Sequence, residues 1–205
     1  MYLPNNVLER LMKKKQQNGF GLIELVIVLL IVAIVVVLAL PQIMSSRRLI
    51  RFSGVQRQVV SALREARQEA MAQRAAITFQ YDNANKRTVI WGGSFGNLGD
   101  SRNRIATVVG DGLQPDDIVY GRPAGASTAS LGDGTNITNL TSDKINVTFQ
   151  TDGSVIDASN NPQNQALFFY GVQNPAETAF AVSVLGAGGR TKIWRYNSGA
   201  NIYVE

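Results

Sequence analysis

The sequence predicts an α+β fold in which one long amino-terminal helix packs on an antiparallel β-sheet domain. Three features support this fold class: an apolar run over residues 20–40, apolar residues that recur every three or four positions up to about Ala76, and short alternating segments from Ile77 onward. We therefore expect four regions. They are a polar amino-terminal segment (1–19), a transmembrane helix (20–40), an amphipathic stalk helix (41–76) and a globular β domain (77–205).

Composition excludes several kinds of chemistry. The 205 residues include no cysteine and no histidine, so the ligands of most zinc sites, the Cys nucleophiles and the Ser-His triads are absent. We expect no cofactor, no metal site and no enzyme activity. Residues 1–19 carry four basic and one acidic side chain, a charge of +3, which leaves +2 of the total +5 for the rest of the chain. This small charge does not by itself indicate a nucleic-acid partner.

The apolar run is long enough to cross a membrane as a helix. At about 1.5 Å per residue, the 21 residues from Phe20 to Leu40 span about 30 Å, and a strand of that length is implausible. Glu24 is the one ionisable side chain in the run. Basic residues flank both ends of the run, so their distribution does not set its orientation.

A cleaved secretory signal peptide is the simplest alternative to a retained span. The run is longer than the apolar core of a usual signal peptide, and Pro41-Gln42-Ile43 offers no small-x-small cleavage site. We therefore expect the span to stay in the mature protein. A plain signal anchor leaves Glu24 unexplained, because a carboxylate near a membrane needs a partner, a proton or access to the interface.

The residues around Glu24 carry a resemblance to a known family. Lys13-Lys14-Lys15 followed by Gly19-Phe20-Gly21-Leu22-Ile23-Glu24-Leu25-Val26 resembles the leader junction of type IV pilins and type II secretion pseudopilins. The resemblance implies that a prepilin peptidase cuts between Gly19 and Phe20 and methylates the new amino terminus at Phe20. It also implies a single-pass inner-membrane protein with a periplasmic carboxy-terminal domain, which later enters a pilus or pseudopilus.

In this family context, Glu24 is expected to act in assembly. A new α-ammonium group and a carboxylate are both costly in lipid, but the ammonium of one subunit can pair with Glu24 of a neighbour in the filament. The expected partners are other pilin or pseudopilin subunits, the prepilin peptidase and the inner-membrane assembly platform. The alternative is a glutamate that reaches the membrane interface without an assembly role.

The leader raises a question about the start of the chain. As given it has 19 residues, whereas Met12 would begin a shorter Met-Lys-Lys-Lys-Gln-Gln-Asn-Gly leader. We expect that Met12 is the true start, with Met1 as the alternative.

The amphipathic helix continues the span past Pro41, where a proline removes one helical hydrogen bond and crowds the preceding turn. A kink or melted stretch is expected near Val37 to Pro41, or the proline marks where the span leaves the membrane. If continuous to about Ala76, the helix is about 85 Å long. Its expected buried face comprises Leu49, Phe52, Val55 or Gln56, Val59, Leu63, Ala66, Ala70 and Ile77.

The β domain begins with a hairpin signal, in which Ile77–Tyr81 and Thr88–Trp91 flank the turn residues Asp82–Lys86. Further strands are expected at Arg104–Val109, Asp117–Tyr120, Lys144–Gln150, Gly153–Asp157, Ala166–Val172, Ala179–Leu185, Thr191–Tyr196 and Asn201–Val204. Gly, Asn, Asp and Ser fill the gaps, most densely in Gly121–Ser142.

This half of the chain resembles the GspH/FimT family of minor pilins and pseudopilins. The resemblance depends on the helix end at residues 63–70, on Val147-Thr148-Phe149-Gln150-Thr151-Asp152-Gly153, and on the late turn Gly188-Gly189-Arg190. In FimT-like members, a Gly-Arg-x-Arg motif near the carboxy end is associated with DNA binding. Here Gly189-Arg190-Thr191-Lys192 matches it with Lys in place of the second Arg, which keeps the charge but loses bidentate phosphate geometry.

Arg190, Lys192 and Arg195 are therefore candidate DNA-binding residues, with backbone amides of the glycine turn beside them. The alternative is a tight hairpin with solvated basic side chains, which the small charge of the mature chain favours.

Three functions remain open from the sequence. The first is a minor pilin or pseudopilin, a structural subunit that aids assembly at or near the tip of a type IV pilus or type II secretion pseudopilus. The second is a DNA-binding, FimT-like tip pilin for DNA uptake. The third is a membrane-anchored periplasmic enzyme, which the scattered carboxylates do not favour.

Overall fold

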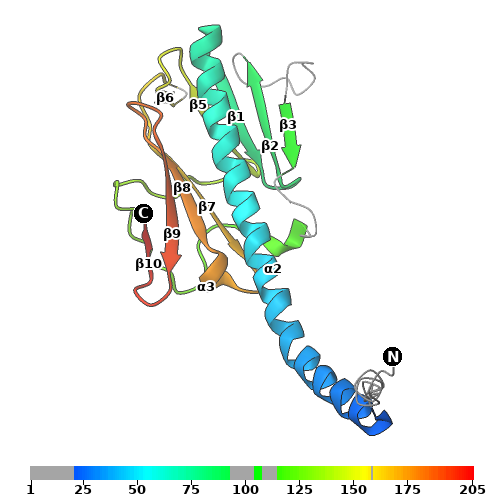
Figure 1. The fold of residues 1–205 in the computed structure, drawn as a ribbon. Helices are drawn as coiled ribbons and strands as arrows, with labels where there is room; N and C mark the ends of the chain where they lie inside the picture. The colour runs from blue at the N-terminus through cyan, green and yellow to red at the C-terminus, as the bar shows by residue number, and fades with distance from the viewer. Residues whose placement is uncertain (1–20, 93–103, 108–114, 158) are drawn as a thin grey trace, which may run out of the picture. The chain divides into compact units, whose positions relative to one another are not determined.

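The computed structural model describes residues 21–92, 104–107, 115–157 and 159–205. The expected leader, the Gly19–Phe20 cleavage site, Met12 and the end of the strand expected at Arg104–Val109 lie outside these residues. The chain divides into two units, one up to Ser45 and the other from Ser46 to Glu205. In the first unit the described residues are helical from Leu22 onward, and the second unit holds both sheets (Figure 1).

Helix α2 (Leu22–Gln73) has 52 residues and is assigned without a break through position 41. It begins where the amides of Glu24 and Leu25 donate to the Gly21 carbonyl, at 3.0 and 3.1 Å. It ends in a Schellman arrangement, because Arg74 takes a left-handed conformation (φ 50°) and the Ala75 amide donates to the Ala70 carbonyl at 3.3 Å. The helix thus ends about three residues before the expected Ala76.

Five strands form the first sheet, sheet A, in the order β3-β2-β1-β5-β6, with every pair antiparallel. Its strands are β1 (Ile77–Asp82), β2 (Arg87–Gly92), β3 (Arg104–Thr107), β5 (Lys144–Phe149) and β6 (Val155–Ile156). The second sheet, sheet B, has the order β10-β9-β8-β7-β4 and is also antiparallel. Its strands are β4 (Ile118–Tyr120), β7 (Gln165–Gly171), β8 (Phe180–Val184), β9 (Thr191–Asn197) and β10 (Ile202–Val204).

The sequence predicted each of these ten strands, but it predicted one sheet where the structure has two. Two short helical segments were also missed: a 3₁₀ turn at Pro115–Asp117 and α3 (Pro175–Thr178), which has proline in its first turn. The strand expected at Gly153–Asp157 is reduced to two residues, because Gly153 has φ 80° and closes the turn before it.

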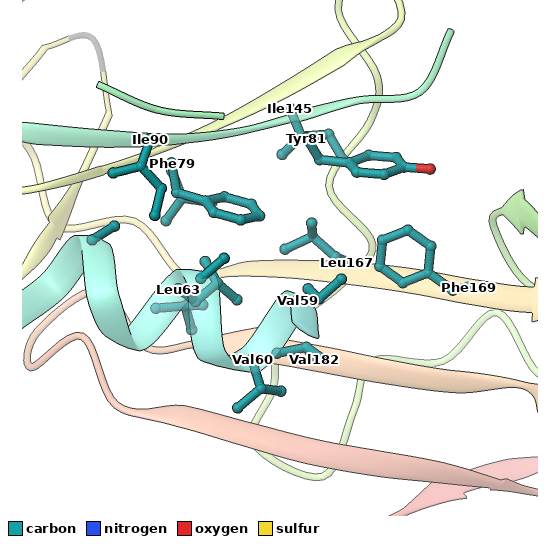
Figure 2. Close-up of a cluster of buried hydrophobic side chains, with 14 of the residues drawn as sticks. Val59, Val60, Leu63, Phe79, Tyr81, Ile90, Ile145, Leu167, Phe169 and Val182 are labelled. Atoms are coloured by element: carbon teal, nitrogen blue, oxygen red, sulfur yellow. The ribbon is translucent and has the colours of Figure 1, made fainter. Parts of the chain in front are cut away.

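The outer half of α2 packs between side chains of both sheets. Figure 2 shows Val59 and Leu63 between Phe79 and Tyr81 of β1 and the side chains of β7 and β8. The Tyr81 and Phe169 rings meet edge to face, with centroids 5.0 Å apart, so the two sheets are in direct contact beside the helix. The helix residues of this core are Phe52, Val55, Val59, Val60, Ala62, Leu63, Ala66 and Ala70. The predicted positions from Phe52 to Ala70 are confirmed, with Val55 and not Gln56 buried. Leu49 is only half-buried, and Val60 and Ala62 were not predicted.

The glycine-rich segment Gly121–Ser142 covers the other face of sheet B. Leu131 of this segment joins a second apolar cluster with Phe168 and Trp194, and Ile137 packs against it. Tyr120 of β4 holds the segment on sheet B, since its hydroxyl donates to the Thr138 carbonyl at 2.5 Å. Sheet B is therefore covered on both faces, by α2 on one and by this segment on the other.

Candidate functional site

The carboxylate of Glu24 lies in the first turn of α2. Its side chain is exposed, and no described residue lies within hydrogen-bond or ion-pair distance of it. An acidic residue in the first turn is favoured by the positive end of the helix dipole. The carboxylate is thus held at the start of the helix and remains open to a partner from another molecule.

The turns of α2 that follow Glu24 present apolar side chains on every face. Over Leu22–Leu40 the mean hydropathy is 3.5, and none of these residues is buried within the molecule. Among the described residues, this is the one helix long and apolar enough to cross a membrane. An uncovered apolar helix with a carboxylate at its start can insert into lipid, and it can pack on neighbouring helices there.

The expected weak point at Pro41 is only partly visible. Helix assignment continues from Val37 through position 41, so a melted stretch is not found. The alternative, a kink at Pro41, would be a change in the direction of the helix axis, and it stays a prediction.

The three candidate DNA-binding residues do not share a surface. Side chains alternate along β9, so Lys192 lies on the face of Trp194, and Arg195 lies on the face of Ile193, which packs on the α2 core. Lys192 is already engaged: its Nζ is 2.7 Å from Oε2 of Glu205 and 5.3 Å from the centre of the Trp194 ring. Arg190 is exposed and precedes the strand.

The glycine turn before β9 is packed and does not form an open phosphate cradle. The Gly186 amide donates to Oδ1 of Asn164 at 2.8 Å, and the Gly189 amide donates to the Leu185 carbonyl at 2.7 Å. A Cβ at Gly186 would lie 2.6 Å from the backbone nitrogen of Gln163. These glycines let two loops approach closely, and the two amides are used within the fold.

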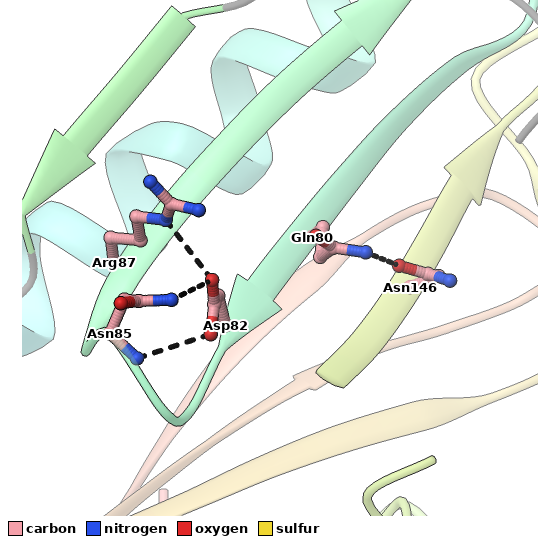
Figure 3. Close-up of polar contacts among 5 residues, drawn as sticks. All are labelled: Gln80, Asp82, Asn85, Arg87 and Asn146. Carbon is pink, nitrogen blue, oxygen red and sulfur yellow. Dashed lines mark hydrogen bonds and ion pairs between the residues drawn. The ribbon is translucent and has the colours of Figure 1, made fainter. Parts of the chain in front are cut away.

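The β1–β2 turn holds a buried carboxylate with a structural role (Figure 3). Oδ2 of Asp82 accepts from Asn85 Nδ2 at 2.8 Å and from Arg87 Nε at 3.0 Å, and Oδ1 accepts from the Asn85 amide at 3.1 Å. Burial alone would raise the pKa of the Asp82 carboxyl, but the hydrogen bonds from Asn85 and Arg87 outweigh it and lower that pKa. Nearby, Gln80 Nε2 donates to Asn146 Oδ1 at 2.7 Å across sheet A.

The sequence did not predict a hollow of about 690 Å³ that lies between α2 and β9. Three arginines line it: Arg57 and Arg64 from the helix and Arg195 from the strand. The seven-residue spacing of the first two indicated a common helix face, but nothing in the sequence indicated that β9 lies beside that face.

Comparisons with known proteins found one sequence motif and several solved structures of similar fold. The prokaryotic N-terminal methylation motif matches residues 14–40. No curated protein gave a significant match. Among solved structures, the chain is similar to the type IV minor pilin FimU of Pseudomonas aeruginosa, with 18% identity and a TM-score of 0.43 over 72% of this chain and 90% of that one. It is also similar to the minor pseudopilin EpsH from the type 2 secretion system of Vibrio cholerae, with 12% identity and a TM-score of 0.38 over 67% and 90%.

The methylation motif coincides with the start of the apolar helix. The chain thus has a prokaryotic N-terminal methylation motif over residues 14–40, a long helix that begins within it, and antiparallel sheets after the helix. The apolar helix within this motif is long enough to anchor the chain in a membrane.

Proposed function

We propose that the chain is a minor pilin or pseudopilin that inserts into a type IV pilus or a type II secretion pseudopilus, at or near its tip. Its function is assembly. Cleavage between Gly19 and Phe20 by the prepilin peptidase frees an amino group that is then methylated, and the subunit passes from the inner membrane into the filament through the assembly platform. Its carboxy-terminal domain lies in the periplasm before assembly.

The observation that carries this proposal is the position of Glu24, within the matched motif and at the start of an uncovered apolar helix. An isolated carboxylate in lipid costs several kcal/mol, and so does the ammonium group at the new amino terminus. When the Glu24 of one subunit pairs with the ammonium of the next, both costs are offset. The pair forms only when the two helices are aligned, so the charges favour one register of assembly.

The proposal is tested by the mass of the amino-terminal peptide, in protein from the native membrane and from sheared filaments. We expect a mature chain that begins at methylated Phe20. The substitution Glu24→Gln keeps the size of the side chain and removes its charge, and it should be processed normally but poorly incorporated. Leu25→Ala is the matched control, because it changes the adjacent exposed residue and keeps the charge.

Two results would contradict the proposal. An intact leader still joined to the span would indicate an ordinary signal anchor. Equal incorporation of the wild type and Glu24→Gln into filaments would show that the carboxylate has no role in assembly.

A further inference from the structure

The hollow between α2 and β9 is lined by side chains from both elements. Arg57 and Arg64 stand on α2, and Arg195 stands on β9 at the opposite wall. Buried Val60 and half-buried Ile193 supply the apolar part of its lining. A second hollow of about 310 Å³ shares Ser53, Gln56 and Arg195 with the first and extends toward α3. We call the first hollow the arginine groove.

The described residues do not balance the charges of the arginine groove. Within the described parts of the protein, Arg57, Arg64 and Arg195 have no hydrogen-bond acceptor and no ion-pair partner for their guanidinium groups. By contrast, Arg67 bonds the Gly153 carbonyl at 3.3 Å, and Arg122 bonds the Ser127 carbonyl at 2.8 Å. Glu65 is the acidic residue among the groove lining, so the groove has an excess of positive charge.

We propose that the arginine groove receives a helix of a neighbouring filament subunit that carries carboxylates two turns apart. This inference rests on the proposed function for the identity of the partner, and on charge complementarity for its chemistry. A guanidinium group is planar and can donate two parallel N–H hydrogen bonds to the two oxygens of a carboxylate. Such a pair therefore fixes the orientation of the bound partner as well as attracting it.

The spacing of the arginines favours a helix as the occupant. Arg57 and Arg64 are seven residues apart, which places them on one face of α2 about 10.5 Å apart along its axis. Carboxylates at positions i and i+7 of a helix lying alongside have the same spacing. Side chains on one face of a strand recur at about 6.6 or 13 Å, so an extended segment meets only one of the two arginines well.

Nucleic acid is the competing occupant, and the lining favours protein. A phosphate chain would meet the Glu65 carboxylate beside the arginines, together with the apolar side chains of Val60 and Ile193. Moreover, the chain after Gly19 carries a net charge of only +2, which gives little long-range attraction for DNA. A helix of mixed charge with an apolar stripe complements all of these groups.

Carbodiimide cross-linking tests the chemistry directly, because it joins amines to carboxylates and leaves arginine unreacted. Arg57→Lys and Arg64→Lys keep the charge and place a reactive amine in the arginine groove of the full-length protein. In sheared filaments we expect a new cross-link, absent from the wild type, to an Asp or Glu in a helix of another subunit. Arg190→Lys is the matched control, since this exposed arginine lies outside the groove, and it should give no such product.

Charge reversal provides a second readout. The double variant Arg57→Glu/Arg64→Glu should be processed and retained in the membrane like the wild type, but its incorporation into filaments should fall about fivefold or more. If the wild type itself is absent from filaments, the proposed function fails and the groove inference fails with it. If the wild type and the double variant are incorporated equally, only the groove inference is overturned.

Two further outcomes would also overturn it. One is incorporation of the lysine variants into filaments without any cross-link from the arginine groove. The other is binding of a single-stranded oligonucleotide to the full-length protein that is lost on charge reversal while incorporation is unchanged, which would make the groove a nucleic-acid site.

Discussion

The carbonyl oxygen of Gly153 occupies the space that a Cβ atom would need if Gly189 were any other residue. A Cβ built on Gly189 would be 1.9 Å from this oxygen, and Gly189 also has φ 58°. The β5–β6 turn and the turn before β9 therefore touch through their backbones, and Arg67 of α2 bonds the same carbonyl at 3.3 Å. The contact joins sheet A, sheet B and the helix at one point.

We predict that Gly189→Ala destabilises the β domain while Gly188→Ala does not. The first substitution combines a left-handed conformation with a backbone clash, which together cost about 2–4 kcal/mol in the free energy of unfolding. An added Cβ at Gly188 would meet nothing within 4 Å. Urea unfolding of the full-length protein in detergent measures both. Equal stability of the two variants would contradict the prediction, because it would mean that the two turns do not touch.

A second prediction concerns the hydroxyl of Thr178, which ties α3 to β7. Its Oγ1 accepts from the Gly171 amide at 2.9 Å and donates to the Asn174 carbonyl at 2.6 Å. Thr178→Val keeps the shape of the side chain but leaves the buried amide without a partner, so we expect a loss of about 1–3 kcal/mol in the free energy of unfolding.

Thr178→Ser is the matched variant, since it restores the hydroxyl and removes only a methyl group. It should recover most of the stability that Thr178→Val loses. If both substitutions cost the same free energy, the methyl group and not the hydroxyl is what holds α3, and the prediction is wrong.

The sequence predicted the elements well because their signals are local. Apolar residues alternate in Ile77–Tyr81 and recur every three or four positions along α2. Each of these patterns reflects the buried face of a single strand or helix. The division into two sheets was not predictable in this way. It depends on β1 pairing with β5 and on β4 pairing with β7, which are contacts between residues far apart in the chain.

The difference between local signals and long-range contacts also explains which candidate sites the sequence could predict. Glu24 was predicted because the motif around it is contiguous in the sequence. Lys192 and Arg195 were grouped because they are close in sequence, although three residues along a strand place side chains on opposite faces. The arginine groove was missed because Arg64 and Arg195 are far apart in the sequence, and only the packing of β9 beside α2 brings them to one hollow.

A third prediction follows from the Asp82 carboxylate. Its pKa is lowered in the folded protein, so the stabilisation from its hydrogen bonds is present above the ordinary aspartate pKa of about 3.9 and is lost as pH falls through the lower folded value. Asp82→Asn removes this titration. We expect wild type to be more stable than the variant by about 1–3 kcal/mol at pH 7, with the difference shrinking below about pH 4.

Unfolding followed by circular dichroism from pH 7 to pH 2 measures this difference. Arg87→Gln should weaken the same pH dependence, because it removes the cation that bonds Oδ2 of Asp82 at 3.0 Å. A stability difference between wild type and Asp82→Asn that stays constant down to pH 2 would be incompatible with a lowered pKa.

A fourth prediction addresses DNA binding by the matched Gly-Arg-x-Lys segment. Arg190→Ala/Lys192→Ala removes two positive charges, but Lys192 is already paired with Glu205, and it faces away from Arg195. We therefore expect retention of a single-stranded oligonucleotide at 50 mM and 200 mM salt to change less than about twofold, because three scattered charges do not act as one phosphate site. A salt-sensitive loss of binding in this variant, with unfolding unchanged, would instead establish these residues as a DNA-binding site and support the tip pilin for DNA uptake.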